Sequence, residues 1–345
     1  MTVVATAGPV AQSPTPATKR VPGWPEGVQA ITYISRADHT RQPCLFYTPV
    51  QASPVPLLVA LHTWSGDYRQ AQPFYAQWCI KNRWAMIHPH CRGPNRSPQA
   101  CGSDLAVQDI LDAVAYAREQ VKIDTNRIYL VGVSGGGYMA MLMAGRAPEL
   151  WAGVSAWCGI HDLAAWHAQQ RQSHGVYDRA LEAVCRGAPG ASAVVDHEYS
   201  HRSPATWLKR ATDVPLDLAA GIADGHSGSV PVSHTLHAFN DLAAEADHIP
   251  EAEIAALTSQ PSVPQALQYS AVDPLYGSRR VLYRRQSRQV RVTLFEGGHE
   301  IVPNVALAWL AAQRRGQSTD WNPGTGTKGA VAFPEEHGGA IESGK

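Results

Sequence analysis

The segment from Ile128 to Pro148, IYLVGVSGGGYMAMLMAGRAP, constrains the fold of this chain more than any other. It begins with a short apolar run, Ile128 to Val133, of the kind that forms a strand buried on both faces. Ser134 and three glycines follow, and a run rich in strong helix formers then begins at Tyr138. The sequence therefore predicts a buried strand that turns directly into a helix, with a polar residue at the bend.

The pattern of a strand followed by a helix recurs along the chain. Helices are predicted over residues 70–82, 103–120, 134–147 and 304–315, between or after the strands. Such alternation is typical of an α/β protein with a mostly parallel sheet and helices on both faces, here with an antiparallel pair at its start. Eight strands are predicted, over residues 30–38, 44–50, 56–62, 84–90, 128–134, 151–159, 216–224 and 291–298.

Other segments depart from this alternation and suggest the domain organisation. Residues 1–27 are rich in Pro, Thr and Ala and are predicted to form a flexible arm before a globular domain over residues 28–315. Within that domain, residues 160–213 are predicted to form an inserted cap after the sixth strand, and residues 246–280 a second excursion. The tail, residues 316–345, is rich in Gly and polar residues and is predicted to be flexible.

The composition argues against several classes of partner. The 29 basic and 29 acidic residues balance, which gives no sign of a nucleic-acid partner, and a basic stretch over residues 279–291 is interpreted as a solvated face. No apolar run approaches the ~18 residues of a membrane span. The N-terminus lacks the charged and apolar regions of a signal peptide, so the sequence gives no support for export and leaves the compartment open.

The six cysteines are scattered, which is unlike a disulfide scaffold. Cys91 and Cys101 flank one loop and can either pair in an oxidising compartment or remain free thiols. No CxxC pair occurs, and the sequence HPHC that ends at Cys91 lacks a second cluster of ligands. No zinc site is therefore predicted.

The five residues Gly132 to Gly136 match the pattern G-x-S-x-G. A serine that projects from a strand-to-helix turn has a strained backbone, and only small residues fit two positions away on either side, where Gly132 and Gly136 stand. The positive end of the next helix favours a developing negative charge, and the Gly135 N–H can donate to an oxyanion. Ser134 is thus predicted to be a nucleophile; a glycine-rich turn that packs or binds phosphate is the alternative.

A serine nucleophile needs a base and an orienting acid, in the chain order Ser, Asp or Glu, then His. His299 follows the last predicted strand in a loop and is the predicted base. Asp224 follows a strand at the carboxyl edge, where ligands bind in such sheets, and is favoured as the acid over Asp217, which lies early in that strand. His226 either lines the site or bonds to its own loop.

The segments LLVALHTWSGDY, GVSGGGYMAMLMAGRAP, GIADGHSGSVPVSH and FEGGHEI resemble the α/β-hydrolase superfamily. They are most similar to the catalytic domain of the prolyl oligopeptidase family and its esterase relatives, over about residues 28–315. The resemblance implies an eight-stranded α/β-hydrolase fold with a small cap. It also implies a triad of Ser134, Asp224 and His299 that transfers an acyl group to water without a cofactor or metal.

By analogy with hydrolases that carry His-Gly-x after the third strand, the second oxyanion donor is the Trp64 N–H, with Thr63 as second choice. Thr63 stands where such hydrolases usually have Gly. Thr63, Trp157 and His226 are predicted to contact substrate. Trp166 and Trp207 are expected to gather with Trp64 and Trp157 at the mouth of the site, although a buried Trp is more often part of a core.

The substrate is predicted less directly. Only about 55 residues precede the third strand, whereas oligopeptidases of this family usually carry an N-terminal β-propeller, which favours an esterase acting on small-molecule or oligosaccharide esters. Acylated carbohydrates, aromatic esters and polyesters are all considered. One alternative is a peptidase for short peptides, in which acidic residues of the cap hold the substrate amine. The candidates are Glu182, Asp196 and Glu198. The other alternative is a binding protein on a hydrolase scaffold, and the oligomeric state stays open.

Overall fold

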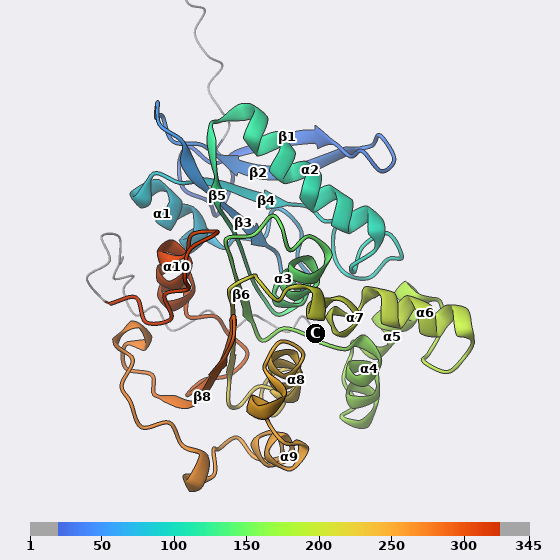
Figure 1. The fold of residues 1–345 in the computed structure, drawn as a ribbon. Coiled ribbons are helices and arrows are strands. Elements are labelled where there is room, and N and C mark those ends of the chain that lie inside the picture. Colours follow the sequence, from blue (N-terminus) through green and yellow to red (C-terminus); the bar gives the residue numbers. More distant parts are fainter. Residues whose placement is uncertain (1–19, 325–345) are drawn as a thin grey trace, which may run out of the picture.

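The computed structural model describes residues 20–324, which fold around one nine-stranded sheet (Figure 1). The strand order is β1-β2-β4-β3-β5-β6-β7-β9-β8. Pairing is antiparallel for β1 with β2, β2 with β4 and β8 with β9, and parallel elsewhere. The strands are β1 (Gln29–Ile34), β2 (Arg41–Tyr47), β3 (Val55–Leu61), β4 (Ala85–Pro89), β5 (Ile123–Val133), β6 (Gly153–Trp157), β7 (Leu216–Gly221), β8 (Val281–Ser287) and β9 (Val290–Phe295).

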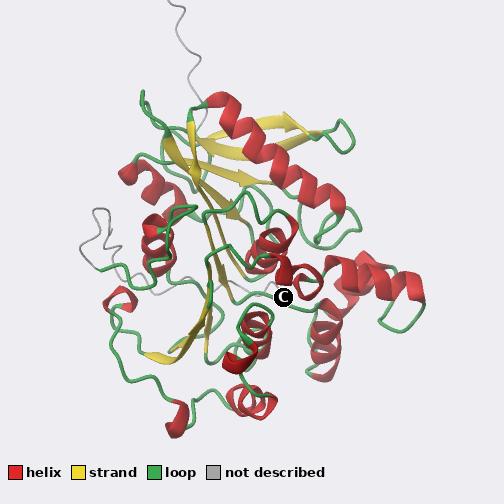
Figure 2. Ribbon diagram, viewed as in Figure 1, coloured by secondary structure: helices red, strands yellow, loops and turns green. Residues whose placement is uncertain are grey.

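Helices cover both faces of the sheet, as Figures 1 and 2 show. Helices α1 and α10 lie on one face, and α2, α3 and α8 on the other (Figure 1). Four further helices, α4 to α7, stand together between β6 and β7 in the chain. The helices are α1 (Pro73–Asn82), α2 (Asp104–Gln120), α3 (Gly135–Arg146), α4 (Leu163–Gln172), α5 (Asp178–Cys185), α6 (Ala193–Arg202), α7 (Pro204–Trp207), α8 (Ser233–Asn240), α9 (Glu251–Ser259) and α10 (Pro303–Ala312).

The central strands are buried along their length because helices cover both of their faces. Every residue of β3, β6, β7 and β9 is buried, which explains why β3, β6 and β7 are mainly apolar, whereas β9 also carries the buried Arg291 and Thr293. Their parallel arrangement brings the carboxyl ends of β3, β5, β7 and β9 to the same edge of the sheet. Loops that follow these strands therefore meet at one place.

The prediction of eight strands was wrong by one, because β8 was missed. Its sequence, VLYRRQS, is rich in arginine, but β8 is an edge strand that pairs only with β9 and buries only part of its length. The basic stretch over residues 279–291 is consequently the β8–β9 hairpin rather than a simple solvated face. Three of its arginines form close ion pairs: Arg284 with Asp273 at 2.9 Å, Arg285 with Glu253 at 2.9 Å, and the buried Arg291 with Asp217 at 2.8 Å.

The packed part of the chain extends beyond residues 28–315 at both ends. Trp24 is buried with its ring 5.2 Å from that of His88, and the Trp321 ring stacks on Trp309 at 5.7 Å. The remaining parts of the predicted arm and tail, residues 1–19 and 325–345, lie outside the described residues. In the range 20–324, every helix is too short or too polar to span a bilayer.

Candidate active site

Ser134 occupies the turn between β5 and α3 in a strained conformation. Its φ is 59° and its ψ is −123°, a combination that non-glycine residues rarely adopt. The Ser134 N–H donates to the Trp157 carbonyl at the end of β6 (2.8 Å), which fixes the turn to the neighbouring strand. The hydroxyl does not cap α3. The strain therefore serves no helix cap, and it holds the side chain out at the carboxyl edge of the sheet.

Glycines make this turn possible because the chain approaches itself closely. A Cβ at Gly132 would lie 2.4 Å from the Gly136 carbonyl carbon, and one at Gly136 would lie 2.5 Å from the Leu61 carbonyl oxygen. A Cβ at Gly135 would lie 2.3 Å from the Trp64 nitrogen. The spacing expected from the sequence thus has a direct steric reason, since only glycine lets the turn pack against β3 and the loop that follows it.

Asp224 and His299 form a hydrogen-bonded pair at the same edge. His299 Nδ1 donates to Asp224 Oδ2 at 2.8 Å, across 75 residues of sequence. The other carboxylate oxygen, Oδ1, accepts from the N–H groups of Gly225 (3.0 Å) and Val230 (3.1 Å). Asp224 is 1% exposed, whereas the His299 side chain is 13% exposed. Both carboxylate oxygens of Asp224 therefore accept hydrogen bonds, and the His299 imidazole is the more exposed member of the pair.

Two backbone N–H groups near Ser134 are unengaged. Within residues 20–324, neither the Trp64 N–H nor the Gly135 N–H donates to another group of the protein. The Thr63 N–H, by contrast, donates to the side chain of Gln70 at 2.8 Å. Of the two oxyanion donors considered after β3, the Trp64 N–H is therefore the one that remains available.

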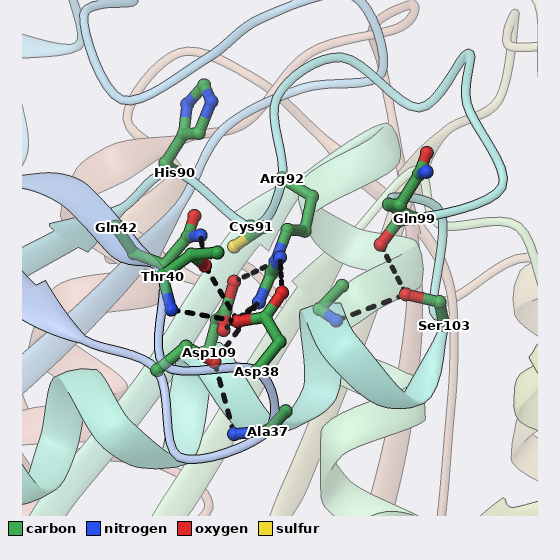
Figure 3. A network of polar contacts seen from close by, with 12 residues as sticks. Ala37, Asp38, Thr40, Gln42, His90, Cys91, Arg92, Gln99, Ser103 and Asp109 are labelled. Carbon is green, nitrogen blue, oxygen red and sulfur yellow. Dashed lines mark hydrogen bonds and ion pairs between the residues drawn. The ribbon is translucent and has the colours of Figure 1, made fainter.

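A neighbouring loop, residues 91–103, braces this region. The Asn95 N–H donates to the Trp64 carbonyl at 2.8 Å. Figure 3 shows how the start of the loop is held: Arg92 reaches Asp38 at 2.6 Å and Asp109 at 2.5 Å. Asp109 is buried on α2, so this ion-pair network ties the loop to the body of the protein.

Several residues predicted to contact substrate have other surroundings. The Trp157 side chain is fully buried, its Nε1–H donates to Ser155 Oγ (2.8 Å) and its ring packs 5.6 Å from Phe295. Thr63 is buried and bonded to Gln70. His226 Nε2 lies 3.0 Å from the Thr258 carbonyl. Trp157 is thus a core residue, and contact of Thr63 and His226 with a substrate stays a prediction.

An aromatic cluster adjoins the site instead. The Trp64 ring lies 4.8 Å from Trp166 on α4 and 6.1 Å from Tyr177, and Trp166 stacks on Tyr177 at 5.0 Å. Trp207 lies elsewhere, with the Arg146 guanidinium 4.5 Å from its ring centroid. Tyr177 was missed in the sequence because neither periodicity nor a motif marks it; it meets the tryptophans only through the fold of the inserted helices.

One group among residues 20–324 has the donor types of a metal site. Ligand atoms of Cys158, Asp224 and His299 lie within 4.8 Å of one another. Burial raises the pKa of the Cys158 thiol well above its usual value, and the Asp224 carboxylate raises it further. Two of the three side chains, Asp224 and His299, are joined by the hydrogen bond of 2.8 Å. All six cysteines, including Cys91 and Cys101, are free and buried.

Part of this chain is similar to a known protein family. Residues 103–255 match the model of the prolyl oligopeptidase family. No curated protein sequence matches the chain. Among solved structures, an acylaminoacyl peptidase of Pyrococcus horikoshii is 16% identical, with a TM-score of 0.48 over 63% of this chain and 35% of that one. This chain thus spans about a third of the length of that peptidase.

Two further solved structures are similar. A thermostable esterase is 18% identical, with a TM-score of 0.47 over 84% of this chain and 64% of that one. The fluorophosphonate-binding serine hydrolase F of Staphylococcus aureus is 17% identical, with a TM-score of 0.45 over 57% of this chain and 80% of that one. The segment that holds the strained serine turn, residues 103–255, is therefore similar to the prolyl oligopeptidase family of serine hydrolases.

Proposed function

We propose that this protein hydrolyses carboxylic esters through an acyl-enzyme intermediate on Ser134. The observation that carries the proposal is the Asp224–His299 hydrogen bond of 2.8 Å, at the sheet edge where the strained Ser134 turn also lies. A nucleophile, a base and an orienting acid supplied by the ends of three strands make the arrangement typical of acyl transfer.

In the proposed reaction, Ser134, His299 and Asp224 act as nucleophile, base and orienting acid. His299 takes the proton of the Ser134 hydroxyl as the oxygen attacks the ester carbonyl carbon, while Asp224 keeps the imidazole oriented through Nδ1. The N–H groups of Trp64 and Gly135 donate to the oxyanion of the tetrahedral intermediate. The C–O bond to the alcohol breaks, and the alcohol leaves with the proton from His299. Water, deprotonated by His299, then attacks the acyl carbon; the bond from that carbon to Ser134 Oγ breaks, the carboxylic acid is released, and His299 returns the proton to Ser134 Oγ.

The surroundings of the cap carboxylates favour an ester over a peptide. Each acidic residue considered for holding a substrate amine has a partner in the cap. Glu182 lies 2.9 Å from His167 Nε2, Asp196 accepts from the Gly190 N–H at 2.6 Å, and Glu198 pairs with Arg202 at 2.7 Å. Esters are also better acyl donors than amides. The family match keeps a peptidase for short peptides as the second candidate.

The aromatic cluster supports a substrate with a flat group. We propose that α4 to α7 form the cap and that Trp64, Trp166 and Tyr177 face the acyl or alcohol group. Trp166 is nearly fully buried and its Nε1–H donates to the Ser229 carbonyl at 2.8 Å, whereas Tyr177 is half-buried. Aromatic acyl groups and acylated sugars are the classes that such rings bind well.

The test compares a short p-nitrophenyl ester with a dipeptide p-nitroanilide, using purified protein and Ser134→Ala as the control. The proposal expects ester turnover that the substitution abolishes. Faster turnover of the anilide would replace the esterase with the peptidase. Equal ester turnover in the wild-type protein and Ser134→Ala would exclude Ser134 as the nucleophile.

A further inference from the structure

The peptide unit between Thr63 and Trp64 carries one of the two proposed oxyanion donors, so its orientation matters. The Thr63 carbonyl accepts from the Gly66 N–H at 3.2 Å and lies 2.9 Å from His62 Nδ1. Across a trans peptide, the N–H points opposite to the C=O. The Trp64 N–H is therefore directed away from His62 and Gly66, provided that Thr63 itself does not rotate.

Gln70 prevents that rotation through two contacts with Thr63. Gln70 Oε1 accepts from the Thr63 N–H at 2.8 Å, and Gln70 Nε2 donates to Thr63 Oγ1 at 2.9 Å. One planar amide thus holds both the backbone and the side chain of Thr63. The first contact also occupies the Thr63 N–H, which leaves the Trp64 N–H as the available donor of this loop.

The loop between the two residues is shaped to seat the Gln70 side chain. A Cβ at Gly66 would lie 2.4 Å from Gln70 Oε1, so the amide fills the space that a side chain at residue 66 would need. The Gln70 N–H donates to the Asp67 carbonyl at 3.0 Å, and the Asp67 carboxylate accepts from the Arg69 N–H at 2.7 Å. This turn places Gln70 back over Thr63.

We infer that Gln70 is a positioning residue for the oxyanion hole. It contacts Thr63 rather than substrate, and it acts by fixing the direction of the Trp64 N–H. The inference rests on the proposed function, since it concerns a transition state formed at Ser134. It also gives a reason for Thr63 in place of the usual Gly, because the threonine hydroxyl is the second point that Gln70 holds.

The test measures kcat and KM for p-nitrophenyl ester hydrolysis in Gln70→Leu and Gln70→Glu. Leucine removes both contacts, and we expect kcat to fall about 10- to 100-fold with KM changed by less than about twofold, because only the transition state loses a donor. Glutamate keeps an acceptor for the Thr63 N–H and is expected to recover kcat to within about fivefold of wild type. Gly66→Ala, which displaces the amide, should lower kcat as Gln70→Leu does.

Gln108→Leu is the matched control. Gln108 is a half-buried glutamine whose Nε2 donates to Asp112 Oδ1 (2.9 Å) on α2, and its loss should leave kcat unchanged. Melting temperatures of all variants show whether a loss of kcat comes from a misplaced Trp64 N–H or from a less stable protein. Wild-type kcat in Gln70→Leu, or an equal loss in Gln70→Glu, would overturn the inference while leaving the proposed function intact. Absence of ester turnover in the wild-type protein would overturn both.

Discussion

At the scale of the residue, the site depends on a few side chains held in unusual conformations. Ser134 has a positive φ that costs on the order of 1–3 kcal/mol, and a strand and a helix on either side maintain it. Asp224 is engaged through both of its oxygens, and only its Oδ2 is directed at His299. These constraints place the strain and the polar burial where the proposed chemistry occurs.

The role of Asp224 leads to the first prediction. Asp224→Asn keeps the volume of the side chain but places a donor or a weaker acceptor opposite His299 Nδ1, so the imidazole loses its required tautomer. We expect kcat for ester hydrolysis to fall about 10⁴-fold at neutral pH, with KM nearly unchanged. Steady-state kinetics of the purified variant measure this.

Asp217→Asn is the comparison for that prediction. Asp217 lies on the same strand, β7, but pairs with the buried Arg291 at 2.8 Å. Its substitution should lower the melting temperature and leave kcat of the folded protein unchanged. A loss of kcat in Asp217→Asn as large as in Asp224→Asn would contradict the assignment of the acid.

At the scale of the element, the turn from β5 into α3 is the most constrained part of the fold. We expect Gly136→Ala to lower the free energy of unfolding by about 3 kcal/mol or more, because its Cβ would meet the Leu61 carbonyl oxygen at 2.5 Å. Urea unfolding followed by circular dichroism measures the change.

Gly153→Ala provides the control at the start of β6. There the new Cβ would meet side-chain atoms of Gln313 and Leu310 at 3.2 and 3.3 Å, and these side chains can shift. The loss of stability should be about 1 kcal/mol or less. Equal losses of stability in the two variants would contradict the claim that the close approach at the serine turn requires glycine at residue 136.

The elements also show what the sequence could predict and why. The central strands were predictable because burial on both faces leaves mainly apolar residues in β3, β6, β7 and the second half of β5. The edge strand β8 was not, since pairing on one side allows arginines whose partners, such as Asp273 and Glu253, are remote in sequence. Local spacing favoured Ser134 as a site residue, and strand ends favoured Asp224 and His299.

The rest of the site could not be predicted from the sequence, because it depends on side-chain direction and on long-range packing. Trp157 stands at the end of β6 next to the serine turn, yet its ring points into the core toward Phe295. Trp166 and Tyr177 reach the Trp64 ring only because the inserted helices fold back over it. The contacts of Gln70 with Thr63 likewise depend on the shape of one turn, which no pattern of residue types specifies.

At the scale of the whole molecule, buried histidines couple stability to pH. Burial lowers the pKa of His88 and of His234 to about 3, from an ordinary value of 6.5. His234 Nδ1 accepts from the His161 N–H at 3.3 Å, and its Nε2 lies 2.8 Å from Gln169 Oε1, so it links α8 to the start of the inserted helices. A proton at Nδ1 would remove the first contact.

Stability falls with falling pH because the unfolded chain binds protons on these histidines at a higher pH than the folded protein does. Below about pH 6.5 the unfolded chain takes up a proton on each histidine, whereas the folded protein does so only near pH 3. The contribution to stability is therefore complete above pH 6.5 and is lost as the pH falls toward 3. We expect the free energy of unfolding to fall by on the order of 1 kcal/mol per pH unit for each histidine.

Urea unfolding between pH 7 and pH 4 measures this dependence. The glutamine in His234→Gln keeps an acceptor and a donor but does not titrate. The free energy of unfolding of this variant should therefore change less steeply with pH than that of the wild-type protein, by the contribution of one histidine. Identical slopes for the two proteins would contradict a buried, neutral His234.

The most direct test of the central claim is the intact mass of the protein after reaction with a fluorophosphonate probe, which forms a stable adduct with an activated serine. The account predicts a single adduct in the wild-type protein, located at Ser134 by peptide mapping, and none in Ser134→Ala. An unmodified wild-type protein, or an adduct that persists in Ser134→Ala, would contradict the claim that Ser134 is the nucleophile.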